Sequence, residues 1–141
     1  MNFPANQKVM TETTAFVDNP TKIYRKGTVV FPKNGAAITT NKKRILGQDS
    51  VIDLNTGGFV VSEDIINVMY FYYIMQHIGF RNYVRRGAVP TLDIKELKSK
   101  LIPVPSLSEQ EYIVSELELL SDIIEKKKAQ LKELDNLAQS I

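Results

Sequence analysis

Three groups of residues in this chain combine positive charge with polar or aromatic side chains, in segments that read as turns. They are Lys33 with Asn34; Thr40, Asn41, Lys42, Lys43 and Arg44; and Tyr83 with Arg85 and Arg86. Lysine and arginine neutralise phosphates, arginine and asparagine bind base edges, and tyrosine can pack on a sugar or base. Any one group could be an ordinary solvated turn. Three groups together favour a nucleic-acid-binding surface.

Catalytic and metal-binding patterns do not support an enzyme. The chain has no cysteine and one histidine, His77, which argues against a zinc site and excludes thiolate chemistry. No glycine-rich phosphate loop, Gly-x-Ser-x-Gly turn or His-Glu-x-x-His motif occurs. Asp49 and Asp53 could be imagined as a nuclease carboxylate pair, but their turn and strand setting favours ordinary surface acids. We expect a binding protein without a metal or cofactor of its own.

Charge divides the chain into a basic part and an acidic part. The 141 residues are 43% hydrophobic and 24% charged, with a net charge of +2. Residues 1–90 carry 11 Lys/Arg against 6 Asp/Glu, whereas residues 91–141 carry 7 against 10. A basic domain can attract a polyanion. The length leaves room for one domain and one further long element.

Neither a membrane-spanning segment nor an export signal is expected. No apolar run approaches the roughly 20 residues that span a bilayer, and the N-terminus lacks the apolar core of a signal peptide. We therefore expect a cytoplasmic protein.

The basic part reads as short strands joined by polar turns and followed by a helix. Alternation and β-branched residues predict strands at the ranges 28–31, 36–40, 45–46, 51–54 and 59–61, with residues 41–44 as an exposed basic tip. An almost wholly apolar helix is predicted to start at Ser62 and to end at Gly79, buried between layers. His77 would lie in its last turn and pack near the core.

A short helix and a stiff proline segment are predicted next. Thr91 or Asp93 would cap the helix, which places Leu97 on its apolar face. Residues 102–105, Ile-Pro-Val-Pro, cannot be helical, because proline lacks the amide donor and restricts the preceding residue. They predict an edge strand or a rigid strut.

The C-terminal segment predicts one long coiled-coil helix. Ser108 with Glu111 forms a Ser-x-x-Glu capping box at its start. Apolar residues then recur at steps of four and three, which is the spacing of a coiled-coil seam. The helix would be roughly 50 Å long and would need a partner. The seam residues are Ile113, Leu117, Leu120, Ile124, Lys127, Leu131, Leu134, Ala138 and Ile141, of which Lys127 alone is charged.

The proline segment is followed after three residues by Glu109-Gln110, at the head of the heptad helix. This order resembles the DNA specificity subunit of type I restriction-modification systems, in which an Ile-Pro-x-Pro segment and a Glu-Gln pair close each target recognition domain ahead of a spacer helix. Residues 26–31 also look like the family's glycine followed by a hydrophobic strand, and residues 63–79 lie where the family has a helix. The resemblance covers residues 24–141.

The resemblance implies a fold and a function. Specificity subunits hold mixed α/β recognition domains apart with two antiparallel helices, and each domain recognises half of a split site in double-stranded DNA. Modification subunits methylate adenine with S-adenosylmethionine, and a restriction subunit uses ATP for translocation and cleavage. The chain would thus be a DNA recognition and scaffold subunit, or half-subunit, that directs these partners and holds no cofactor itself.

The resemblance also sets expectations for the fold class and domain organisation. We expect an α+β chain, with a recognition domain at residues 1–107 and a spacer helix at residues 108–141. The family usually has several tens of residues before the strand at 28–31, so the N-terminal part of the domain is expected to be missing. Two copies could pair their seams antiparallel as a homodimer, with Glu116, Glu118 and Asp122 near the lysines at 126–128 and 132.

Two other functions fit the same residues. The chain could be the C-terminal recognition module of a single-chain restriction-methyltransferase, or a coiled-coil interaction adaptor that does not bind DNA. The sequence gives neither the recognised bases nor the oligomeric state.

Overall fold

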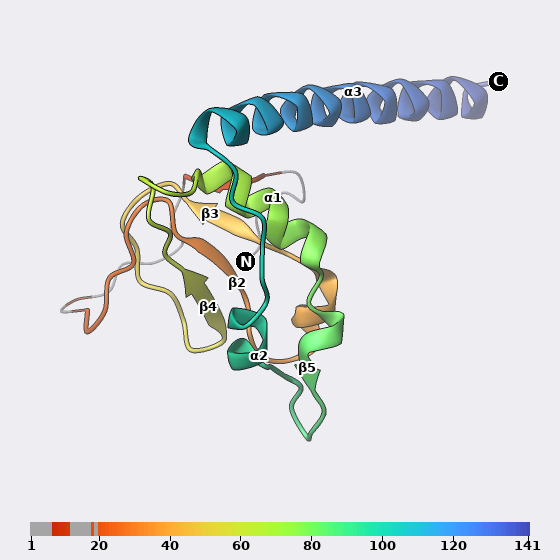
Figure 1. The fold of residues 1–141 in the computed structure, drawn as a ribbon. Helices are drawn as coiled ribbons and strands as arrows, with labels where there is room; N and C mark the ends of the chain where they lie inside the picture. The colour runs from red at the N-terminus through yellow and green to blue at the C-terminus, as the bar shows by residue number, and fades with distance from the viewer. Residues whose placement is uncertain (1–6, 12–17, 19) are drawn as a thin grey trace.

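A four-stranded mixed sheet lies at the centre of the structure (Figure 1), a computed structural model that describes residues 7–11, 18 and 20–141. β1 is parallel to β3, while β2 pairs antiparallel with β3 on one side and with β4 on the other. This register places Val29 opposite both Ile45 and Phe59. The strands follow the order β1 (Val9–Met10), β3 (Arg44–Leu46), β2 (Val29–Pro32) and β4 (Thr56–Phe59).

Helix α1 (Val68–Ile78) packs against this sheet. Its Tyr72 is buried in a cluster with Val29 of β2 and Ile45 of β3. The helix ends at Gly79, as predicted, where a φ of 61° favours a residue without a side chain. The predicted helix is therefore confirmed, with Tyr70, Tyr72 and Met75 buried, but His77 in its last turn is exposed, so its predicted packing near the core was wrong.

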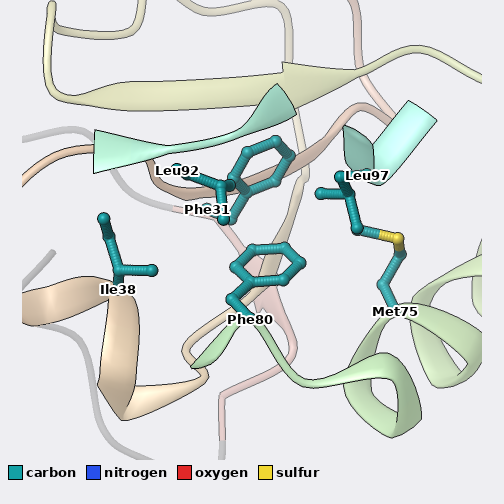
Figure 2. Close-up of a cluster of buried hydrophobic side chains, with 6 residues drawn as sticks. All are labelled: Phe31, Ile38, Met75, Phe80, Leu92 and Leu97. Carbon is teal, nitrogen blue, oxygen red and sulfur yellow. The ribbon is translucent and has the colours of Figure 1, made fainter. Parts of the chain in front are cut away.

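A second cluster of buried side chains holds the later, smaller elements to the sheet and to α1 (Figure 2). The rings of Phe31 and Phe80 meet edge to face, with centroids 5.1 Å apart. Four short elements follow α1 in the chain: η2 (Arg81–Tyr83), β5 (Val84–Arg85), β6 (Thr91–Leu92) and α2 (Ile94–Lys98). The cluster consists of Phe31, Ile38, Met75, Phe80, Leu92 and Leu97.

The predicted start of α1 at Ser62 was wrong. The Ser62 carbonyl accepts from the amides of Ile65 and Ile66 and so closes a separate turn. Asn67 is the N-cap, and its side chain accepts from the Tyr70 amide at 3.0 Å. An asparagine side chain caps a helix as well as serine does. Ser62 and Asn67 were therefore both possible N-caps, and the helix begins after Asn67.

The predicted strand at 36–40 was also wrong, because these residues form the 3₁₀ helix η1 (Ala36–Thr40). The Thr39 and Thr40 hydroxyls donate to carbonyls three residues earlier, at 2.9 and 2.6 Å. Such local side-chain bonds compete with strand pairing. The adjacent Gly35 and Asn41 take positive φ values of 78° and 56°, which bend the backbone at both ends of η1.

Two further strand predictions need correction. Residues 51–54 form no strand, since Asp53 accepts from the Asn55 amide and the Thr56 hydroxyl and closes a turn. The strand expected at 59–61 was misplaced: β4 begins three residues earlier and contains only Phe59 of the predicted range. Gly57 of β4 pairs with Phe31, and a glycine is needed there because the Phe31 ring lies against it: a Cβ at this position would be 2.5 Å from Cε2 of Phe31.

The chain leaves the domain through the predicted proline strut and continues as one helix, α3 (Leu107–Gln139) (Figure 1). Asp93 caps α2, as one of the two alternatives predicted. Ser106 caps α3 and forms a reciprocal capping box with Glu109, so the predicted cap at Ser108 was two residues too late. The fold class, an α+β domain followed by one long helix, is confirmed. The division at residues 107 and 108 remains our proposal.

Among the described residues, no helix is long and apolar enough to cross a membrane.

Candidate nucleic-acid interface and helix-pairing surface

The residues Lys33 and Asn34 follow β2 and run beside β6. The Leu92 amide donates to the Lys33 carbonyl at 2.8 Å, and the Gly35 amide donates to the Pro90 carbonyl at the same distance. This backbone pairing places both residues next to the β5–β6 hairpin, residues 84–92. The Asn34 side chain points instead toward the loop after residue 53, where it donates to Asn55 Oδ1 at 3.3 Å.

The hairpin carries two exposed arginines with different surroundings. Arg85 Nε donates to Asp93 Oδ2 at 2.5 Å, and the same carboxylate caps α2. The pKa of Asp93 is lowered by the Glu96 backbone amide and, to a smaller extent, by Arg85. Arg85 keeps 67% of its side chain exposed in this ion pair, and Arg86 is exposed. Tyr83, by contrast, packs against the core cluster.

The segment after η1 presents one exposed lysine. Asn41 adopts a left-handed conformation, and its Nδ2 donates to the Gln76 carbonyl in the last turn of α1 at 3.0 Å. Thr40 donates to the Ala37 carbonyl within η1. The side chains of Asn41 and Thr40 therefore already donate to backbone carbonyls of the domain, whereas Lys42 is exposed to solvent.

Lys43 and Arg44 do not form the exposed basic tip that the sequence predicted. Lys43 is 0% exposed, lies 4.0 Å from the centroid of the Phe80 ring and donates to Asn41 Oδ1. Burial lowers the pKa of Lys43 to about 8. Arg44 is 5% exposed within β3 and donates to the Lys43 carbonyl at 2.9 Å. We therefore leave both residues out of the candidate interface.

The remaining basic residues of the prediction gather at one end of the domain. η1 and the β5–β6 hairpin lie at the end remote from α3 (Figure 1). Ile38 of η1 and Leu92 of the hairpin share the buried cluster with Phe80, so both segments are held against one core (Figure 2). We call this region the distal end; the predicted basic residues that are exposed or half-exposed there are Lys33, Lys42, Arg85 and Arg86.

The seam of α3 is exposed over most of its length. Its leucines and isoleucines are uncovered after the first turns; Leu131, for example, is 61% exposed. Leu119, Ile123 and Leu137, outside the predicted seam, are exposed as well, so the apolar surface is wider than a narrow heptad stripe. Lys127 is also exposed, so its charge reaches solvent.

A different side of α3 faces the domain. The side chain of Gln110 is buried, Val114 packs beside Tyr70 of α1, and Glu118 bonds with Lys8 and Tyr73. Sequence reasoning missed these contacts, because they join α3 to residues 43 to 110 positions away in the chain. Their one visible signal was the Glu109-Gln110 pair, whose structural role the pattern did not reveal.

The chain was compared with known protein families and matches a described family over most of its length. The family model described as the type I restriction modification DNA specificity domain matches residues 6–135. No curated protein matches the chain.

Proposed function

The chain belongs to the type I restriction-modification DNA specificity family, and on that premise we propose that its distal end makes the DNA contacts. Subunits of this family recognise the target sequence within a restriction-modification complex and are not catalytic. Partner subunits carry out methylation and restriction, and they bind S-adenosylmethionine and ATP. A cytoplasmic location remains a prediction.

The proposal about the distal end rests on one observation: cations from two separate segments are exposed there on rigidly held backbone. Lys42 follows a 3₁₀ helix whose Ile38 is buried, and the backbone of Arg85 in β5 pairs with Thr91 of β6. A two-stranded ribbon can enter the major groove, where arginine binds guanine bidentately. Arg86, close to the hairpin tip, is our candidate for a base contact, and Lys42 our candidate for a phosphate contact.

Single substitutions test this assignment. Arg86→Ala should weaken binding to the target sequence by about 1–3 kcal/mol and relax specificity at one position. Lys42→Ala should weaken binding to all sequences and reduce the salt slope by about one. Affinities would be measured by fluorescence anisotropy at several salt concentrations, with the modification subunits present. Lys26→Ala, an exposed lysine next to Gly27 beside the start of α1, is the matched control. Wild-type affinity in both distal variants would remove this end from the interface.

For the exposed seam we propose a second copy of this chain as the partner, paired antiparallel. In a pair centred on Lys127, the two lysines face each other, and their exposure lets both charges remain in water. Asp122 would then lie opposite Lys132 of the other copy. Glu118 is no longer a candidate for such a pair, because Lys8 holds it at 3.0 Å.

Solution mass tests the homodimer. Wild-type chain should have the mass of two copies in sedimentation equilibrium, and Leu131→Glu should shift it to one copy, since a buried charge without a partner is costly. Ala129→Glu adds the same charge on the opposite side of α3, where the residue is exposed, and should leave the dimer intact. A wild-type chain that stays monomeric at every concentration would contradict self-pairing.

A further inference from the structure

Gln110 joins the start of α3 to the start of α1. It is fully buried, although it lies in the first turns of a helix that is otherwise mostly exposed. Its Oε1 accepts from the Asn67 amide at 2.7 Å. Its Nε2 donates to the carbonyls of Ile65 at 3.0 Å and Pro105 at 2.8 Å. Both amide hydrogens and the carbonyl oxygen thus have partners, as a buried amide requires.

A second polar contact lies two turns further along α3. Lys8 Nζ donates to Glu118 Oε2 at 3.0 Å and to the Tyr73 hydroxyl at 2.8 Å. The Tyr73 hydroxyl donates to Glu118 Oε1 at 2.5 Å. Burial alone would raise the pKa of Glu118, but the hydrogen bonds from Tyr73 and Lys8 outweigh burial and lower it. The carboxylate is therefore ionised and doubly held at neutral pH.

The two contacts fix both the position and the direction of α3. Gln110 and Glu118 are eight residues apart, which is about 12 Å along a helix. Between them, Val114 packs into the cluster of Val61, Ile66 and Tyr70. After Ser121 every described residue of α3 is exposed, so nothing else in the described part of the chain restrains the far half. A helix held at one point could pivot, whereas a helix held at two separated points cannot.

We propose that Gln110 and Glu118 are positioning residues that set the angle between the recognition domain and α3, and thereby the spacing between the DNA half-sites. The proposal rests on the proposed function for its second part, because half-sites require two domains on paired helices. Its first part, the angle, concerns this chain alone.

A small change in this angle at the domain moves the far end of α3 by several ångströms. From Glu118 to the end of α3 at Gln139 is roughly 32 Å at about 1.5 Å per residue. A swing of about 10° at the domain would therefore move the far end of such a helix by roughly 6 Å. Successive base pairs lie about 3.4 Å apart. Such a swing would shift a domain at the other end by more than one base pair, so a fixed spacing requires a fixed angle.

The angle can be measured directly with spin labels. The chain has no cysteine, so Lys95→Cys on α2 and Asn136→Cys on α3 provide two unique labelling sites. Double electron–electron resonance on labelled chain, diluted in unlabelled chain, should give one narrow distance distribution. Gln110→Met keeps the side-chain volume and removes all three hydrogen bonds. We expect its distribution to broaden by several ångströms, while Glu111→Gln, exposed on the same helix, stays narrow.

A second variant keeps the test decisive if Gln110→Met fails to fold. Glu118→Gln leaves the first contact intact and removes the charge from the second, and it should also broaden the distribution. Wild-type distributions in the folded variants would overturn the proposal. In complexes with the modification subunits, the broadened variants should accept half-sites at altered spacings. Because the distances need no DNA, a chain with these distances that fails to bind DNA would overturn the proposed function and leave the angle proposal standing.

Discussion

The two ends of the recognition domain use similar polar residues in opposite ways. At the elbow, where α3 leaves the domain, Lys8 and Gln110 are hydrogen-bonded to groups of the chain itself. At the distal end, Lys42 and Arg86 extend into solvent. The difference shows that residue type alone does not separate a structural contact from a binding contact. What separates them is whether the chain already supplies the partner.

The neighbouring residues Lys42 and Lys43 show the same difference between an exposed and an enclosed side chain within the distal end. Lys42 is exposed, whereas Lys43 is enclosed beside Phe80 and has a pKa of about 8 instead of 10.5. Between these two pH values the unfolded chain binds more protons at Lys43 than the folded chain does. Folding stability should therefore rise as the pH increases from about 8 toward 10.5.

Substituting Lys43 and Lys42 separately tests this difference through the pH dependence of the free energy of unfolding. The free energy of unfolding of the wild-type chain should rise by roughly 1–2 kcal/mol between about pH 7.5 and 9.5. Lys43→Met should abolish this rise, and Lys42→Met should leave it unchanged. Urea unfolding followed by circular dichroism at each pH would measure both. An unchanged pH profile in Lys43→Met would mean that Lys43 is not enclosed in solution.

At the elbow, the two serines at the start of α3 give a smaller predicted effect on stability. Ser106 is the N-cap and its side chain accepts from the Glu109 amide, whereas Ser108 is the second residue of the helix. Ser106→Ala should destabilise the folded chain by about 1 kcal/mol, since it removes an N-cap. Ser108→Ala should change the stability by a few tenths at most. The reverse order in thermal unfolding would place the helix start at the predicted site instead.

The long helix and the proline strut could be predicted because their signals are local. Alternate prolines exclude a helix whatever surrounds them, and a seam of fours and threes needs only helical geometry. The cap was misplaced because Ser106 with Glu109 and Ser108 with Glu111 both fit the capping-box pattern. The structure uses the first pair, which places Gln110 where it can reach α1. Which serine caps the helix thus depends on packing against α1, which the local sequence pattern does not contain.

The distal end was harder to predict because burial there is decided by tertiary packing. Residues 41–44 read as an exposed basic tip, yet Lys43 and Arg44 are buried and, of these four residues, only Lys42 is exposed. Lys43 gains a favourable cation–π contact from the Phe80 ring, and the spacing of these two residues in the sequence does not predict that contact. The sequence thus located the segments of the candidate interface, and the structure selected residues within them.

Selection from a random DNA pool tests the central claim most directly. Wild-type chain with its modification subunits should enrich a defined split sequence, and Arg86→Ala should lose preference at one position within a half-site while the spacing stays unchanged. Failure of the wild-type complex to enrich any sequence would contradict DNA recognition by this chain.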